Sequence, residues 1–128
     1  VIQDRTIYED VEIFSRNLHE MNFMTDRDWR TYKDLFRNMT QFLRKPDLII
    51  YLRASTDTLL SRVQSRDRDF ERKISPEYLH SLNIAYDKWI SHCKDQKVLI
   101  IESDSFNIFE DRKQLNNILD QTEEALTE

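Results

Sequence analysis

The chain has 128 residues, of which 39% are hydrophobic and 34% charged, a composition typical of one soluble globular domain with a helix-rich surface. Its formal net charge of −5 and its short apolar runs predict that neither nucleic acid nor a membrane is a partner. The single cysteine, Cys93, excludes an internal disulfide and is typical of a reducing compartment, so we expect a cytoplasmic protein.

The first third of the chain predicts a short strand and two helices. Residues 1–3 open on an apolar pair that indicates a strand, and residues 8–20 carry apolar side chains at helical spacing. Thr25 is a good N-cap for a second helix, whose apolar stripe continues to Leu43. That helix should end before Pro46, because the residue before a proline disfavours the helical conformation.

The remaining chain predicts two more strands and three more helices. Residues 47–53 and 97–102 are nearly continuous apolar runs rich in β-branched side chains, which is typical of strands buried on both faces of a parallel sheet. The predicted helices are residues 55–66 with Ser55 or Thr56 as N-cap, a helix from Pro76 to Ile90 with Ser75 as N-cap, and residues 109–126.

Strands that alternate with helices in this order favour an α/β fold with layers around a parallel sheet. In such folds the functional site lies beyond the carboxyl ends of the strands. Residues 4–10 and 102–107 follow two of the predicted strands, so we expect functional side chains there. The chain shows no internal repeat and no interdomain linker, and residues 1–128 are therefore expected to form a single domain.

Charged residues after the first predicted strand suit a binding site. Arg5 can hold a phosphate or orient a carboxylate through its fork of donors, and the carboxylate of Asp10 can accept hydrogen bonds from the amino group of a base. These residues also have structural alternatives. Asp4 and Arg5 could form a salt bridge, Thr6 could cap the helix, and Asp10 could be favoured by the helix dipole. From these residues alone the structural alternatives are favoured.

An arginine cluster gives a stronger signal. Arg62 and Arg66 are four residues apart, so they share a helix face, where their like charges repel unless an anion lies between them. A triphosphate is such an anion, and phosphoryl transfer requires several positive donors. Arg68 and Arg72 follow within the charged segment 67–73, which an ordinary solvated surface would also explain.

The order of these motifs resembles one family. DRTIYEDVEIF, DWRTYKDLF, PDLIIYLRAS, LSRVQSRDRDFE and ISPEYLHSLNIAYDKWI together resemble the deoxynucleoside kinases, most of all the bacterial deoxyadenosine and deoxyguanosine kinases. The resemblance covers nearly the whole chain. It implies a three-layer α/β fold of the P-loop NTPase type with a parallel sheet. It also implies ATP-dependent phosphorylation of the 5′-hydroxyl of a deoxynucleoside, a purine one, in nucleotide salvage.

The resemblance implies roles for residues on the acceptor side. Residues 4–6 are similar to the family's Glu/Asp-Arg-Ser motif, in which Arg5 would position the nucleoside 5′ end and the catalytic carboxylate, assisted by Asp4. Asp10 corresponds to the aspartate that recognises the base, and it favours an amino-bearing base or guanine over thymine. Phe14 would line the base pocket.

On the donor side, a lid of about residues 62–73 would grip the phosphates of ATP through Arg62, Arg66 and Arg68. The family's lid normally has the sequence Arg-Gly-Arg, and here Asp67 replaces the glycine. This aspartate adds a negative charge between two arginines that are expected to bind phosphate.

Further contacts are implied by the same resemblance. Glu71 corresponds to the carboxylate that binds the deoxyribose 3′-hydroxyl, and residues 102–107, with Phe106, correspond to the loop that packs against the adenine of ATP. Magnesium would accompany ATP, with its ligands mostly outside this chain. A homodimer is implied, with the two long helices at residues 8–20 and 25–43 as the contact surface.

The chain contains no glycine, whereas the family holds phosphates on a glycine-rich P-loop that carries Lys and Ser/Thr. In the family's pattern that strand–P-loop–helix part, and the general base, precede the region matched here. We therefore expect residues 1–128 to be the C-terminal two-thirds of a deoxynucleoside kinase, inactive by themselves. The alternatives are a nucleoside monophosphate kinase of the thymidylate kinase type and a kinase-derived binding domain without catalysis. The three histidines show no zinc spacing, and no metal site is expected.

Overall fold

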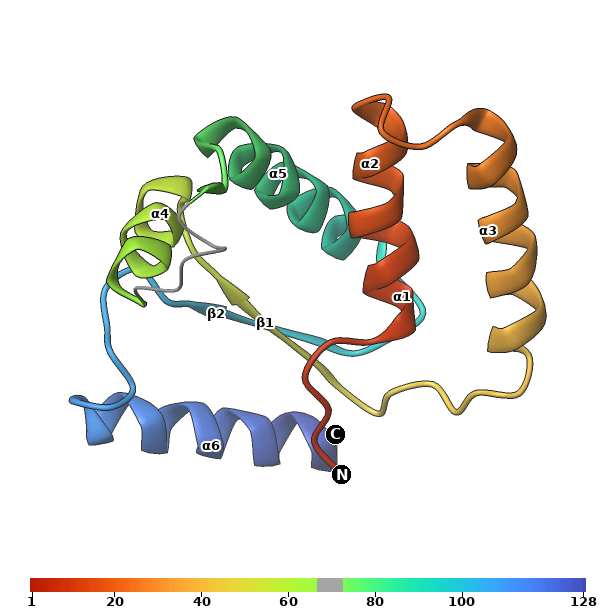
Figure 1. Ribbon diagram of the computed structural model, residues 1–128. Coiled ribbons are helices and arrows are strands. Elements are labelled where there is room, and N and C mark those ends of the chain that lie inside the picture. Colours follow the sequence, from red (N-terminus) through yellow and green to blue (C-terminus); the bar gives the residue numbers. More distant parts are fainter. Residues whose placement is uncertain (67–72) are drawn as a thin grey trace. The chain divides into compact units, whose positions relative to one another are not determined.

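The structure is a computed structural model that describes residues 1–66 and 73–128. The described residues form two compact units, Val1–Lys45 with His80–Ser91 and Pro46–Leu79 with His92–Glu128. None of the described helices is long and apolar enough to cross a membrane. The elements in Figure 1 are α1 (Ile7–Glu9), the π-helix η1 (Asp10–Ser15), α2 (Arg16–Glu20), α3 (Asp26–Thr40), β1 (Ile49–Arg53), α4 (Thr56–Ser65), α5 (Pro76–His92), β2 (Val98–Glu102) and α6 (Arg112–Thr127).

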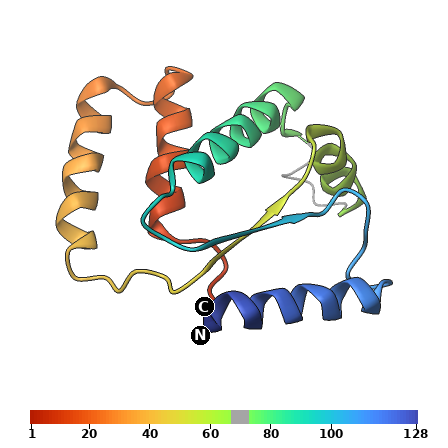
Figure 2. The same ribbon diagram turned by 180° about the vertical axis from the view of Figure 1, so that it is seen from behind.

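The first unit is helical. Residues 7–20 form one unbroken helical segment that lies beside the antiparallel α3 (Figures 1 and 2). Ile13 is fully buried at 0% exposure, and Val11 and Ile90 are buried with it in the core of this unit. Each such side chain stabilises the fold by about 2 kcal/mol through the apolar surface it removes from water. Amphipathic helices therefore build this unit as their spacing predicted.

The second unit contains a parallel two-stranded sheet. β1 pairs with β2 from Ile49↔Val98 to Arg53↔Glu102, which confirms the predicted parallel arrangement. α6 lies along the sheet in Figure 1. The Lys97 ammonium donates a hydrogen bond at 3.1 Å to the carbonyl oxygen of Ala125, near the C-terminal end of α6. The α/β class expected from the order of strands and helices is thereby confirmed. The expectation of a single domain over residues 1–128 stays a prediction.

Three of the predicted helix starts are confirmed in detail. The side-chain oxygens of Thr25, Ser55 and Ser75 accept hydrogen bonds from the backbone N–H three residues on, at 3.1, 3.3 and 3.1 Å. Ser55 rather than Thr56 is therefore the cap of α4. Each cap satisfies an amide that the first turn of the helix leaves without an intrahelical partner.

The predicted strand at residues 1–3 is wrong. This segment has no regular structure, and both Val1 and Ile2 are exposed. A strand needs a neighbour with which to form a hydrogen-bonded ladder, and β1 and β2 are the only strands in the described ranges. Two apolar residues are too short a pattern to distinguish a strand from an extended tail.

The predicted burial of both strand faces is also wrong in part. Leu52 is 58% exposed, and Ile50 and Ile100 are exposed as well. Side chains of a strand alternate between the two faces of a sheet, and a face is buried only where other elements pack on it. The described elements leave these three side chains exposed. The apolar run in the sequence indicates a strand but does not show how fully its faces are covered.

Two helix ends differ from prediction for local reasons. α6 begins at Arg112 instead of residue 109, because the Asp111 carboxylate accepts a hydrogen bond from the Gln114 N–H at 3.1 Å and caps the helix there. α3 ends at Thr40, short of Leu43. The Thr40 hydroxyl donates to the carbonyl of Phe36 at 3.0 Å, the local back-bonding that is typical of Ser and Thr in helices.

Candidate functional site

The predicted site residues fall into the two units, and each group is described by itself. Arg68 and Glu71, together with Asp67, lie outside the described residues. The first unit holds Asp4, Arg5, Asp10 and Phe14, and the second holds Arg62, Arg66 and Phe106.

Arg5 has an unusual backbone and a defined side-chain position. Its φ of 60° lies in the left-handed region, which costs a non-glycine residue about 1 kcal/mol or more. Its guanidinium carbon lies 4.8 Å from the centre of the Phe14 ring, a cation–π contact. The described structure contains no Asp4–Arg5 ion pair, so the structural alternative for this arginine is not what is found. The Arg5 guanidinium thus lies against the Phe14 ring, and its role in binding stays a prediction.

Thr6 occupies the N-cap position of α1, as its structural alternative predicted, but its side chain makes no capping hydrogen bond. Its Oγ1 atom is buried and has no hydrogen-bond partner among the described residues. A buried hydroxyl left in this state costs about 1–3 kcal/mol unless water or a ligand completes it. A polar atom next to Arg5 is thus available to a further partner.

Glu9 and Tyr86 extend the Arg5–Phe14 contact into a connected cluster. The Tyr86 hydroxyl donates to Glu9 Oε2 at 3.2 Å, and its ring meets Phe14 edge to face at 6.3 Å between centroids. Burial raises the pKa of the Glu9 carboxyl, while the hydrogen bond from Tyr86 and the charge of Arg5 lower it. The nearby carboxylates of Asp10 and Asp4 raise it further. Glu9 is therefore a half-buried carboxylate whose charge depends on its neighbours.

Asp10 is the first residue of the π-helix and Phe14 lies in the same six-residue segment. π-Helical turns are rare and often occur at functional sites, because the wider turn changes which side chains share a face. Asp10 is exposed, next in the chain to Glu9. Arg5, Asp10 and Phe14 therefore lie at or near the start of one helical segment, and their roles in binding stay predictions.

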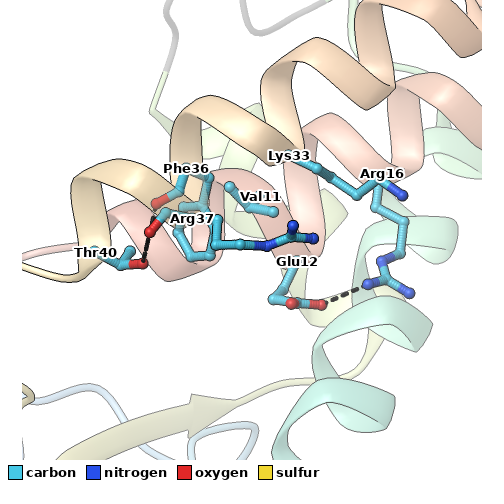
Figure 3. A pocket seen from close by; sticks show the side chains of 7 residues that line it. All are labelled: Val11, Glu12, Arg16, Lys33, Phe36, Arg37 and Thr40. Atoms are coloured by element: carbon cyan, nitrogen blue, oxygen red, sulfur yellow. Dashed lines mark hydrogen bonds and ion pairs between the residues drawn. The ribbon is translucent and has the colours of Figure 1, made fainter.

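A separate pocket of about 200 Å³ lies between the segment 7–20 and α3 (Figure 3). Its cationic side chains already have partners within the unit. Arg16 pairs with Glu12 at 2.7 Å, and the Lys33 ammonium lies 5.3 Å from the Trp29 ring. None of the predicted site residues lines it, and we assign it no ligand. Its lining residues are Val11, Glu12, Arg16, Lys33, Phe36, Arg37 and Thr40.

In the second unit, Arg62 lies on α4 and reaches the residue that follows β2. Its Nη1 donates to the Ser103 hydroxyl at 3.1 Å, and its Nη2 donates to the Ser103 carbonyl oxygen. Arg62 is half-buried and Ser103 is buried. The structure thus joins a predicted phosphate-binding arginine to the predicted adenine loop.

The same loop is tied to the start of α4. The Asp104 carboxylate accepts a hydrogen bond from the Ser55 N–H at 2.8 Å, and this bond is the main reason why the pKa of Asp104 is lowered. At the carboxyl ends of the strands, the Arg53 guanidinium bonds to the Glu102 carboxylate and lowers the pKa of that group. Polar contacts therefore surround the place where a parallel sheet is expected to present its site.

The other described donor-side residues are Arg66 and Phe106. Arg66 is exposed at the C-cap of α4, one turn after Arg62. Phe106 is half-buried in the turn between β2 and α6. In the described residues no group of three or more His, Cys, Asp or Glu side chains is arranged to hold a metal ion.

Glu9, Tyr86, Ser103 and Asp104 take part in these clusters, and none of them was singled out from the sequence, although Glu9, Ser103 and Asp104 lie in the candidate segments 4–10 and 102–107. Tyr86 lies in the predicted helix from Pro76 to Ile90, and the residue that its hydroxyl bonds to lies 77 residues earlier in the chain. Ser103 lies 41 residues after Arg62. Only the polar positions directly after a buried strand gave any signal for Ser103 and Asp104.

Comparisons with known proteins identify the family of this chain. The sequence profile of the deoxynucleoside kinase family matches residues 1–127. The chain is 46% identical over 89 residues to a deoxyadenosine kinase of Dictyostelium discoideum, and this match covers 70% of this chain and 36% of that protein. It is 33% identical over 122 residues to a deoxyadenosine/deoxycytidine kinase of Bacillus subtilis, with 94% of this chain and 56% of that protein covered. The chain thus spans about half the length, or less, of these relatives.

A solved structure of deoxyadenosine kinase from M. mycoides with bound dCTP matches with a TM-score of 0.77 and 30% identity, over 91% of this chain and 62% of that one. The enzyme with bound dATP matches with a TM-score of 0.74 over 91% of this chain and 60% of that one. These likenesses confirm the expected α/β kinase fold.

Proposed function

Since this chain belongs to the deoxynucleoside kinase family, we propose that it forms part of an ATP-dependent kinase that phosphorylates the 5′-hydroxyl of a deoxynucleoside in nucleotide salvage. The observation that carries the proposal is the cluster in which Arg5 stacks on Phe14 beside Asp10. Of the residues that the family resemblance assigns to the acceptor, Asp4, Arg5, Asp10 and Phe14 belong to this one unit. The P-loop and the general base are proposed to lie outside residues 1–128, so that these residues are inactive by themselves.

The proposed chemistry depends on positioning and charge. The γ-phosphoryl group leaves ATP and bonds to the 5′-oxygen, and negative charge spreads over the phosphoryl oxygens as it moves. Arg5, assisted by Asp4, would orient the 5′ end of the nucleoside. Guanidinium groups of the lid, Arg66 and Arg68 among them, would offset the charge of the phosphates. Magnesium supplies further neutralisation in this class of reaction, but the described carboxylates do not fit a metal site, and its ligands are proposed to lie elsewhere.

Asp10 supports a preference for an amino-bearing base over thymine, and we propose that the acceptor is deoxyadenosine or deoxyguanosine. A carboxylate accepts hydrogen bonds from the exocyclic amino group of a base, which thymine lacks. The Dictyostelium protein is named for deoxyadenosine, and the Bacillus protein for deoxyadenosine and deoxycytidine, and the bases of both nucleosides carry an amino group. Phe14, held between Arg5 and Tyr86, would pack against the base.

Turnover of separate acceptors by the full-length protein tests this proposal. With ATP as donor, we expect deoxyadenosine or deoxyguanosine to be phosphorylated fastest, and thymidine slowest. A preference for thymidine would contradict the role of Asp10. Turnover of nucleoside monophosphates alone would establish the thymidylate kinase alternative, and binding without turnover would establish a non-catalytic domain.

A cytoplasmic homodimer is proposed on the basis of α3 and the residues that follow it. Leu35 and Met39 on α3 are exposed, and Phe42 just beyond it is 88% exposed. Apolar side chains gathered in this way on an amphipathic helix are typical of a surface that another copy covers. Sedimentation of the full-length protein should give the mass of two chains, and Leu35→Asp should shift it toward the mass of one.

A further inference from the structure

Arg62 is held by two hydrogen bonds to one buried residue. Its guanidinium donates to two different acceptors of one residue, the hydroxyl and the carbonyl oxygen of Ser103. Ser103 is only 6% exposed, so these acceptors have little access to water. A two-point contact from a planar guanidinium fixes both the distance and the orientation of its partner.

Ser103 in turn is fixed to the end of β1. Its hydroxyl donates to the carbonyl oxygen of Arg53 at 2.9 Å, and its backbone N–H donates to the same oxygen at 2.8 Å. The next residue, Asp104, accepts from the N–H of Ser55 at 2.8 Å. The first two residues of the segment 103–107 are therefore held by β1, by the start of α4 and by Arg62.

We propose that Arg62 is a positioning residue that holds the adenine-binding loop in place through Ser103, instead of a direct ligand of the ATP phosphates. This inference rests on the proposed function, because it concerns the donor site of the same kinase. To turn both nitrogens toward a phosphate, Arg62 would leave two buried acceptors of Ser103 without these partners. Each lost partner of a buried polar group is costly, which favours retention of the contact when ATP binds.

A role of Arg62 in holding the loop and a role in binding phosphates predict different effects on the choice of donor. A loop that packs on the base of the donor discriminates between bases, whereas arginines on the phosphates act equally on every nucleoside triphosphate. Loss of Arg62 should therefore weaken the preference for adenine. Loss of Arg66, which has the exposed position at the end of α4, should weaken binding of all donors alike.

The test compares ATP, GTP and UTP as donors for the full-length protein, with Arg62→Ala, Ser103→Ala and the double variant. We expect Arg62→Ala to raise the KM for ATP by about tenfold, the order expected for a charged hydrogen bond, and the KM for GTP and UTP by less than about twofold. Maximal turnover with saturating donor should change little. Ser103→Ala should shift donor preference in the same direction, and the double variant should resemble Arg62→Ala, because the two residues share one contact.

Two further variants complete the comparison. Arg62→Lys keeps the charge but not the planar fork, so we expect it to lose adenine preference as Arg62→Ala does. Ser61→Ala, at an exposed position on the same helix, should leave donor preference unchanged. Thermal melting of each variant shows whether the fold is retained.

An equal rise in KM for all three donors on Arg62→Ala, restored by Arg62→Lys, would overturn the inference and establish a phosphate contact. Loss of melting temperature with unchanged donor preference would overturn it as well. Absence of turnover by the unaltered protein with any donor is a different result, since it contradicts the proposed function itself.

Discussion

Removal of one hydroxyl group tests the acceptor-side cluster. In Tyr86→Phe the ring that meets Phe14 edge to face is kept, and the 3.2 Å hydrogen bond from the hydroxyl to Glu9 is lost. Hydrogen bonds to charged groups contribute about 1.5–3 kcal/mol, and this one is long and only half-buried, so we expect a loss of about 1 kcal/mol in the free energy of unfolding. If all of that free energy is expressed at the acceptor site, the KM for the nucleoside rises by about fivefold.

The pH dependence of the Tyr86→Phe effect has a definite sign. Burial raises the pKa of Glu9 and the Tyr86 hydrogen bond opposes that rise, so the variant should have a higher Glu9 pKa than the unaltered protein. Arg5 also lowers this pKa, whereas Asp10 and Asp4 raise it. In the folded variant, the Glu9 carboxyl therefore keeps its proton to a higher pH than in the folded unaltered protein. In the unfolded state the two proteins bind this proton alike. The loss of stability should therefore grow as pH rises through the Glu9 pKa.

Urea denaturation of both proteins from pH 4 to pH 8 measures this difference. Tyr32→Phe is a matched control, because its ring stacks on Trp29 and its hydroxyl makes no hydrogen bond to the described residues. We expect the control to change stability by less than about 0.5 kcal/mol at every pH. A Tyr86→Phe loss that is the same at pH 4 and pH 8, or no larger than the control, would refute the coupling between Tyr86 and Glu9.

Three other substitutions test separate parts of the account. Ile13→Ala should lower the free energy of unfolding by about 3 kcal/mol in urea denaturation, because Ile13 is the fully buried centre of the first unit, and a loss below about 1 kcal/mol would contradict that position. Asp10→Ala should reduce turnover of deoxyadenosine far more than it lowers the melting temperature, and parallel losses would favour a structural role for this exposed residue. Asp104→Asn should lower the melting temperature at pH 7. The difference should shrink as pH falls through the depressed pKa of Asp104, because protonation then removes from the unaltered protein the charge that accepts from the Ser55 N–H, and the variant lacks this charge at every pH. A difference that does not shrink at any acidic pH at which both proteins still fold would contradict that assignment.

Features with local signals were predictable from the sequence. Thr25, Ser55 and Ser75 cap helices because the capping bond spans three residues, and their types and positions are visible in the sequence. Parallel pairing of β1 with β2 follows from two apolar strands separated by helices. The cap at Asp111, with Gln114 three residues later, carried the same kind of signal and was missed in favour of the apolar residues before it.

Features that depend on distant partners were not predictable in this way. Val11, Phe14 and Leu18 have the spacing of an α-helix, and nothing in that pattern distinguishes the π-helix Asp10–Ser15. The Tyr86–Glu9 bond joins two segments whose proximity only the fold creates. The contact of Arg62 with Ser103 likewise needs β2 to end beside α4, although both positions were placed in candidate segments.

The central claim, that these residues belong to a kinase of deoxynucleosides, is tested most directly by product analysis. The full-length protein is incubated with ATP and deoxyadenosine, and the products are separated and identified by mass. The account predicts deoxyadenosine 5′-monophosphate and ADP in equal amounts, with much less product from thymidine. Consumption of deoxyadenosine monophosphate in place of deoxyadenosine, or no phosphorylated product from a folded protein that contains the P-loop, would contradict it.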